Sequence, residues 1–259
     1  MSTILFDEII FGPIHSRRLG ISLGINLLPT NGKKCSFDCI YCECGYNKDF
    51  KTDSPLPSRE AVYEALKNKL AQLRKDNIFP DVFTFAGNGE PTMHPKFAEI
   101  IDDTISLRDA YFPNAKISVL SNAAHIHRKS IFEALKKVDN NILKLDSGKI
   151  ETIRLMDRPL PKDYSVERQV KLLQQFEGNF ILQTMFLRGE HEGQKVDNTT
   201  EEELDAWIKT LEATQPKEVM IYTIDRETPE KQLEKVSLEE LKSIALRIEK
   251  LGFKTNVAG

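Results

Sequence analysis

From residue 21 to its end, the chain alternates short apolar runs with amphipathic segments, and this alternation constrains its fold more than any other feature. The runs are rich in Ile, Val, Leu and Phe, as parallel strands buried on both faces should be. Between them, apolar residues recur three or four positions apart, which predicts helices with one buried stripe. Strands are expected at 21–28, 82–86, 117–120, 142–146, 180–187 and 219–223, and helices around 62–73, 97–105, 131–135, 204–211 and 241–248. The pattern predicts an α/β protein.

The order of these elements favours a barrel. No Gly- or Ser-rich linker and no repeat divides the 259 residues, a length that α/β barrels often reach as one domain. Six strand–helix units in series, joined by right-handed crossovers, would curl the sheet. We expect a single domain over residues 1–259, a partial (β/α)6 TIM-like barrel with its core at 20–230 and a C-terminal helix and tail at 231–259. An open doubly wound sheet is the alternative fold.

Composition narrows the class of protein. The net charge of −3 excludes a strongly basic nucleic-acid coat, although it allows a local basic patch. No apolar stretch approaches the ~20 residues that a membrane helix needs. The first eight residues carry two acids and no basic segment, so they do not read as a signal peptide. We expect a cytoplasmic protein without a membrane partner.

All four cysteines lie within ten residues, between Cys35 and Cys44. Disulfides would be spread along the chain to close loops, so this clustering favours metal ligation. Cys35, Cys39 and Cys42 form the spacing C-x3-C-x2-C. Iron–sulfur cubanes usually take four thiolates, and a loop that offers three leaves one iron open. Zinc is the alternative, but its sites usually combine C-x2-C pairs from two segments. Cys44 lies outside the spacing, and we expect a small buried residue there.

Polar residues follow the predicted strands at the points where the chain leaves the sheet. In a barrel these points share one rim, which is where chemistry gathers. Lys144 and Asp146 alternate with Leu143 and Leu145, so both should face the barrel interior. A structural ion pair is the alternative for these two residues. The rim segments are the cysteine loop, 87–91 (Gly-Asn-Gly-Glu-Pro), Ser121 with Asn122, Lys144 with Asp146, and Asp225 with Arg226.

The cysteine loop resembles the signature of the radical S-adenosylmethionine (radical SAM) superfamily, in which Tyr41 fills the aromatic position before the last cysteine. Segment 87–91 is similar to that family's GGE loop after the second strand. Further segments resemble a branch of Fe–S oxidoreductases related to the wyosine synthases of tRNA; they are 11–13, 16–20, 22–24 and 223–226.

The resemblance implies two cofactors and the residues that hold them. Cys35, Cys39 and Cys42 would bind a [4Fe–4S] cluster, and SAM would chelate the open iron. The residues implied in SAM binding are Tyr41, Gly87, Asn88, Gly89, Glu90, Ser121, Asn122, Lys144 and Asp146. An external one-electron reductant of the flavodoxin or ferredoxin type would supply the electron.

The resemblance also implies an activity, namely reductive cleavage of SAM to a 5′-deoxyadenosyl radical that modifies a substrate. A tRNA base is one substrate candidate; a peptide, a protein or a small metabolite is the other. A non-catalytic Fe–S electron carrier or a zinc-binding module is the alternative of another class, although neither needs the separate nucleoside loops.

Arginines are the candidates for substrate contacts, because their guanidinium groups suit phosphate and carboxylate. A rim of basic groups, Lys33, Lys34, His125, His127, Arg128 and Lys129, could hold RNA phosphates. The candidate arginines are Arg17, Arg18, Arg154, Arg158, Arg188 and Arg226.

Overall fold

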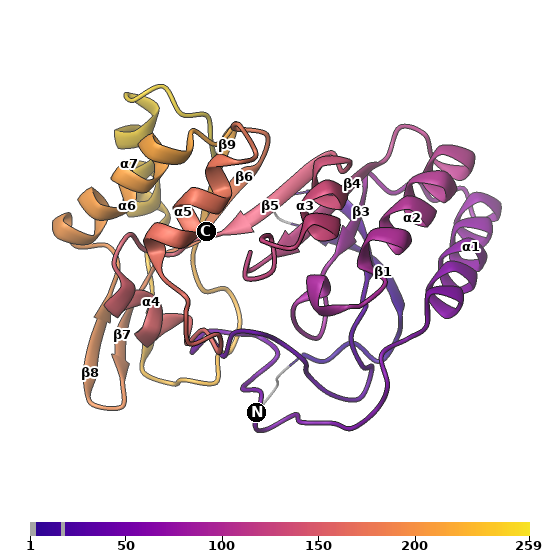
Figure 1. The fold of residues 1–259 in the computed structure, drawn as a ribbon, viewed down its shortest axis with the longest axis horizontal. Helices are drawn as coiled ribbons and strands as arrows, with labels where there is room; N and C mark the ends of the chain where they lie inside the picture. Colours follow the sequence, from indigo (N-terminus) through magenta and orange to yellow (C-terminus); the bar gives the residue numbers. More distant parts are fainter. Residues whose placement is uncertain (1–3, 17–18) are drawn as a thin grey trace.

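A curled, mostly parallel sheet forms the centre of the computed structural model, which describes residues 4–16 and 19–259 (Figure 1). Its eight strands follow the order β1-β2-β3-β4-β5-β6-β9-β11, and β1 alone runs antiparallel to its neighbour. The strands are β1 (Ile10–Ser16), β2 (Gly20–Ile25), β3 (Val82–Phe85), β4 (Lys116–Ser121), β5 (Asn140–Lys144), β6 (Ile181–Met185), β9 (Glu218–Tyr222) and β11 (Thr255–Ala258). This half-barrel confirms the predicted partial TIM-like barrel.

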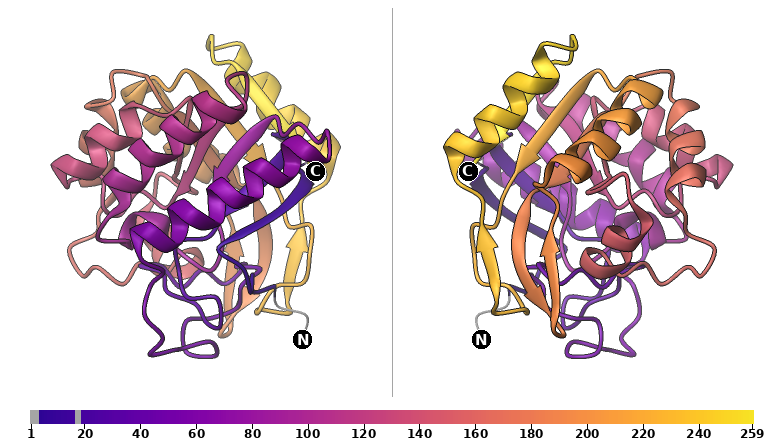
Figure 2. Two further views of the ribbon diagram at one scale, coloured as in Figure 1. Left: turned by 90° about the vertical axis from the view of Figure 1, so that its right-hand side faces the viewer. Right: turned by 90° about the vertical axis from the view of Figure 1, so that its left-hand side faces the viewer.

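Helices cover the outer face of the sheet (Figure 2). Their N-termini are fixed by side-chain caps at several points: Thr200 accepts from the backbone of Glu203, and Ser237 accepts from that of Glu240. The helices are α1 (Arg59–Lys75), the short 3₁₀ helix η1 (Pro91–Met93), α2 (Phe97–Tyr111), α3 (Lys129–Lys136), α4 (Ile150–Met156), α5 (Val166–Gln174), α6 (Glu201–Thr214) and α7 (Leu238–Glu249).

The two faces of the strands differ in chemistry. Residues that face the helices, such as Leu23, Phe85 and Val119, belong to one large buried apolar cluster. Residues of opposite parity face the barrel interior and include hydroxyls and charges; Ser22 and Thr84 hydrogen-bond there at 2.7 Å. The interior is therefore polar enough to hold functional groups.

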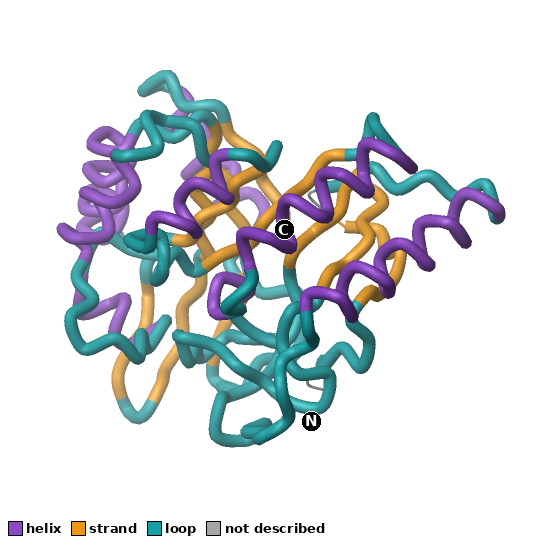
Figure 3. Tube along the Cα trace, turned by 45° about the vertical axis from the view of Figure 1, so that its right-hand side comes forward, coloured by secondary structure: helices purple, strands orange, loops and turns teal. Residues whose placement is uncertain are grey.

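A second, three-stranded sheet extends from the C-terminal end of the barrel. Its order is β10 (Leu233–Lys235), β7 (Leu187–His191) and β8 (Gln194–Asp197), all antiparallel. The run predicted as one strand at 180–187 is interrupted at Phe186, where the chain passes from β6 to β7. The long loops gather at this same end, below the strands in Figure 3.

The sheet extends beyond the core expected at 20–230, because β1 precedes it and β11 pairs with β9. The expected C-terminal tail thus contributes a strand to the same barrel. Within the described residues, no helix combines the length and apolar character needed to cross a membrane.

Candidate functional site

The cysteine loop lies across the C-terminal end of the barrel and is held by backbone hydrogen bonds to distant segments. Ile40 donates to Met156 at 2.9 Å, and Asp38 donates to Asp157 at 3.1 Å. Leu160 donates back to Ser36 at 2.9 Å. Residues 156–160, at the end of α4 and just after it, therefore hold the cysteine loop in place through backbone hydrogen bonds. Cys35, Cys39 and Cys42 are free and partly buried.

Two neighbouring side chains influence the ionisation of Cys42. The thiol of Cys44 and the ammonium of Lys33 both lie against it and lower the pKa of Cys42 to about 6. Burial raises the pKa of Cys35 to about 12 and that of Cys39 well above its ordinary value. Cys44 is buried, and its thiol also lies 3.5 Å from the carbonyl of Gly87.

The loop that contains Gly87 and Gly89 packs directly against the cysteine loop. Lys34 donates to the carbonyl of Asn88 at 2.9 Å, and Glu90 donates back to Lys34 at 3.1 Å. Both glycines have positive φ, and a Cβ on Gly89 would lie 1.9 Å from the carbonyl oxygen of Lys34. Gly89 is therefore required for the contact between the two loops, which the sequence did not reveal.

The side chain of Asn88 is used within the protein. It donates to the carbonyls of Phe6 and Pro29, both at 2.8 Å, and accepts from the backbone of Phe6. Asn88 is fully buried. Its side chain thus fastens the N-terminal segment to the loop. Its backbone is also engaged, because its N–H donates to Asn26 at 3.1 Å and its carbonyl accepts from Lys34.

Glu90 joins two loops that the sequence predicted separately. Its carboxylate accepts from the hydroxyl of Ser121 at 2.8 Å and from the backbone of Asn122 at 2.7 Å. Burial raises the pKa of Glu90, although these hydrogen bonds act against the rise. Asn122 in turn donates to Ser36 at 3.0 Å and to the sulfur of Cys35 at 3.7 Å. One network therefore runs from Glu90 to a candidate ligand.

A buried charged cluster lies beside Cys39. Lys144 contacts Asp157, lies 3.2 Å from Asp146 and donates to the sulfur of Cys39 at 3.4 Å. The hydroxyl of Tyr41 contacts Asp146 and lies 3.1 Å from Asp157. Burial alone would lower the pKa of Lys144, but the two carboxylates outweigh it and raise that pKa.

Asp157 is the residue of this cluster that the sequence analysis missed. It is 1% exposed, and its Oδ2 atom has no hydrogen-bond partner among the described residues. Burial and the charge of Asp146 raise the pKa of Asp157 to about 7. It follows a short helix rather than a strand, so the barrel rule did not point to it.

The donor set fits an iron–sulfur cubane. Three thiols from one loop lie between two lysines, Lys33 and Lys144, and a buried carboxylate oxygen nearby is unpartnered. In the described part of the chain, no three His, Cys, Asp or Glu side chains are arranged to hold a single metal ion. A cubane spreads its thiolates further apart than one ion does, because its ligands bind different irons.

The candidate arginines fall into different settings. Arg188 contacts Glu240, and Arg226 lies 2.8 Å from Glu43 of the cysteine loop, so both have carboxylate partners. Arg158 is partly buried and lies over the ring of Tyr46 at 5.3 Å. Arg154 is exposed. Arg17 and Arg18 lie outside the described residues.

The predicted basic rim is only partly available to a ligand. Lys33 is 5% exposed and turned toward the thiols, so it does not face solvent as expected. His125, His127 and Arg128 line a small cavity of about 250 Å³ with Arg168 of α5. The first residues that line this cavity, from Ala124 onward, come just after Ser121 and Asn122 in the chain.

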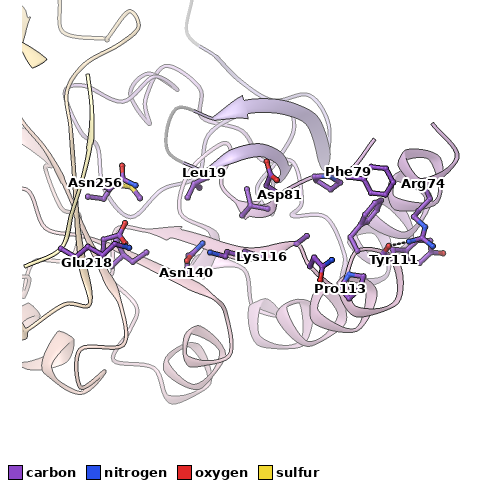
Figure 4. Close-up of a pocket in the computed structure, with 18 residues that line it drawn as sticks. Leu19, Arg74, Phe79, Asp81, Tyr111, Pro113, Lys116, Asn140, Glu218 and Asn256 are labelled. Atoms are coloured by element: carbon purple, nitrogen blue, oxygen red, sulfur yellow. Dashed lines mark hydrogen bonds and ion pairs between the residues drawn. The ribbon is translucent and has the colours of Figure 1, made fainter. Parts of the chain in front are cut away.

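A larger hollow lies at the other end of the barrel, where the strands begin (Figure 4). It measures about 790 Å³ and runs from Asn256 and Glu218 past Lys116 to Phe79 and Arg74. None of the cysteines lines it. Its size therefore does not mark the candidate site.

Comparison with known proteins gives a family match. A model of the Radical SAM superfamily matches residues 32–195, well over half of the chain. A Brachyspira hyodysenteriae protein named GTPase Obg is 31% identical over 237 residues, covering 90% of this chain and 32% of that protein. A UPF0026 protein of Helicobacter pylori is 31% identical over 183 residues, covering 70% and 57%. The chain thus spans about a third and somewhat over half of these relatives.

Solved structures share the fold at low sequence identity. A radical SAM methyltransferase from Sphaerobacter thermophilus has a TM-score of 0.67 at 11% identity, covering 92% of this chain and 65% of that one. Streptococcus suis SuiB bound to precursor peptide SuiA has a TM-score of 0.64 at 14% identity, covering 91% and 48%. TYW1 with a lysine-pyruvate adduct has a TM-score of 0.57 at 14% identity, covering 88% and 73%. The likeness concerns the half-barrel itself.

Proposed function

This chain belongs to the radical SAM superfamily, and on that premise we propose that Cys35, Cys39 and Cys42 hold its [4Fe–4S] cluster. The observation that carries the proposal is the placement of three thiols between two lysines at the C-terminal end of the barrel. When bound by these residues, the cluster would supply the electron for reductive cleavage of SAM to methionine and a 5′-deoxyadenosyl radical. A flavodoxin or ferredoxin is the proposed electron donor.

The proposed SAM site uses backbone more than side chains in the loop of Gly87 and Gly89. The side chains of Asn88 and Glu90 and the backbone of Asn88 are engaged with protein partners, so we assign the approach to the methionine end of SAM to the backbone of Gly87 and Gly89, which carry no side chain. We assign the ribose to Ser121 and Asn122, as the resemblance implies. Tyr41 would contact the adenine through its backbone, because its hydroxyl is engaged with Asp146 and Asp157.

In this proposal, the protein's own contribution to the reaction is to keep the surroundings of Cys39 apolar and ordered. An apolar cluster of Ile40, Met156, Met185 and Leu187 packs against Cys39. Such a lining excludes water from a reactive intermediate. Lys144 and Asp146 are held by each other, by Asp157 and by Tyr41, and in this proposal they would meet SAM as a pre-ordered ion pair.

The test is anaerobic reconstitution with iron and sulfide, followed by dithionite and SAM. We expect about four irons and four sulfides per chain and release of 5′-deoxyadenosine. A zinc-binding module would instead hold equimolar zinc without acid-labile sulfide. An electron carrier would take up the cluster but release no 5′-deoxyadenosine, and either result would contradict the proposal.

For the substrate, the observation that favours RNA is the small cavity lined by His125, His127, Arg128 and Arg168. Arg128 has no carboxylate partner among the described residues, whereas Arg168 contacts Asp163. A free guanidinium beside two imidazoles suits a phosphate. The resemblance to wyosine synthases points to tRNA, while SuiB provides a peptide-binding example of the same fold.

RNA binding is tested by measuring tRNA affinity across a salt series. We expect affinity to fall as salt rises, because phosphate contacts release counterions. Arg128→Gln should weaken binding and flatten the salt slope, and Arg74→Gln at the opposite end of the barrel is the matched control. Salt-insensitive binding, with no stimulation of 5′-deoxyadenosine release by tRNA, would favour a peptide or small-molecule substrate.

A further inference from the structure

Lys33 is a fully buried cation whose surroundings contain thiols instead of carboxylates. Its side chain is 5% exposed, and its ammonium donates to the carbonyl of Gly45 at 2.5 Å, next to Cys42, whose carbonyl accepts from the backbone of Gly45 at 2.8 Å. No carboxylate forms an ion pair with it in the ranges 4–16 and 19–259. A buried charge without an opposite charge is costly. The neighbouring thiols supply the opposite charge when they are present as thiolates.

We infer that Lys33 is the built-in counter-charge for the thiolate ligands and thereby sets the reduction potential of the cluster that they hold. This inference rests on the proposed function. Three thiolates around a cubane give it net negative charge, and reduction adds one more electron. A nearby cation stabilises the more negative, reduced form more strongly, because the attraction scales with charge.

The neighbouring residue provides a natural contrast. Lys34 carries the same charge one position later, but its side chain is exposed. Its backbone, and not its ammonium, makes the contacts to Asn88 and Glu90. Solvent screens an exposed charge, so Lys34 should have little influence on the cluster.

The experiment compares Lys33→Met with Lys34→Met after anaerobic reconstitution with iron and sulfide. The midpoint potential is measured by a mediated redox titration followed by electron paramagnetic resonance. We expect Lys33→Met to move the midpoint to more negative values and Lys34→Met to leave it close to that of the wild type. Iron loss to a chelator should be about tenfold faster in Lys33→Met, the scale seen for partners of metal ligands.

Unfolding of the cluster-free protein separates this role from a structural one. In the cluster-free protein, Lys33→Met removes a buried charge together with its hydrogen bond to Gly45, so the midpoint denaturant concentration should change little, whereas a structural lysine would lower it strongly. Lys33→Gln keeps a donor but loses the charge, and it should show the same shift of potential; it also carries the test if Lys33→Met does not fold.

Two outcomes overturn the inference. The first is a midpoint potential equal to that of the wild type in Lys33→Met, or in Lys33→Gln if Lys33→Met does not fold. The second is a loss of the cluster that is fully explained by a loss of stability of the cluster-free protein. A wild-type chain that takes up no cluster would instead contradict the proposed function itself.

Discussion

The two ends of the barrel differ in how deeply their charged side chains are buried. At the C-terminal end, Lys33, Lys144 and Asp157 are buried against thiols and one another. At the N-terminal end, Lys254 pairs with Glu218 at the edge of the hollow, with its side chain 73% exposed. The hollow is the larger cavity, yet its charged groups are ordinary surface groups. Burial of charge, and not cavity volume, therefore marks the end where chemistry is proposed.

The largest expected effect comes from the ligand cysteines. Cys35→Ala, Cys39→Ala or Cys42→Ala should each abolish cluster uptake and SAM cleavage, because the loop offers only three thiolates to the cubane. Cys44→Ala is the matched control and should retain iron, measured by iron and sulfide analysis. Loss of iron from the control alone would reassign the ligands.

Gly89→Val should cost about 3 kcal/mol or more of stability, since valine disfavours the φ of +136° and its Cβ would meet the carbonyl of Lys34. Denaturant unfolding of the cluster-free protein measures this cost, and calorimetry with SAM measures binding to whatever fraction remains folded. Gly193→Ala, with open space around its Cβ in a loop with φ of +75°, is the comparison. Equal destabilisation by both would show that contact between the loops contributes nothing.

Tyr41→Phe should destabilise the protein by about 1–3 kcal/mol, because Asp146 and Asp157 lose a buried hydrogen-bonding group. The ring remains, so packing against Met185 and Leu187 is kept. Urea unfolding is the measurement. Tyr63→Phe on helix α1, where no side-chain hydrogen bond of the hydroxyl is present among the described residues, is the control and should be near neutral.

The smallest effect is expected at the opposite end. Lys254→Ala breaks an exposed pair with Glu218 and should change stability by no more than about 1 kcal/mol. Its rate of 5′-deoxyadenosine release should equal that of the wild type. A large loss of activity in this variant would break the contrast between the two ends and make the hollow part of the catalytic apparatus.

Periodicity in the sequence was sufficient to predict the barrel. Each predicted strand overlaps an observed one, since strands buried on both faces produce continuous apolar runs. Strands β1, β7, β8, β10 and β11 were not predicted, because half-exposed strands carry no such run. Helix α4 was missed because it has only seven residues, and α5 was missed because the polar Gln169 interrupts its buried face between Val166 and Leu173.

The sequence predicted the candidate-site residues that directly follow strands. It did not predict those whose position depends on how distant segments pack together. The barrel rule correctly placed Lys144 and Asp146 together at the rim. The same rule did not predict Asp157, which lies beside Lys144 because its segment is hydrogen-bonded to the cysteine loop. Nor did it reveal the direction of Lys33, which the sequence analysis placed at a surface facing phosphates.

The backbone partners of the cysteine loop come from almost the whole length of the chain. Ile4 bonds to Glu43, Asn88 to Lys34, Met156 to Ile40, and Glu230 to Ile40. During synthesis, residues 35–42 emerge from the ribosome long before residue 230. The thiols then lack part of their backbone support until residue 230 has been translated. We therefore expect the proposed cluster to be inserted after that point, and the thiols to be open to oxidants until then.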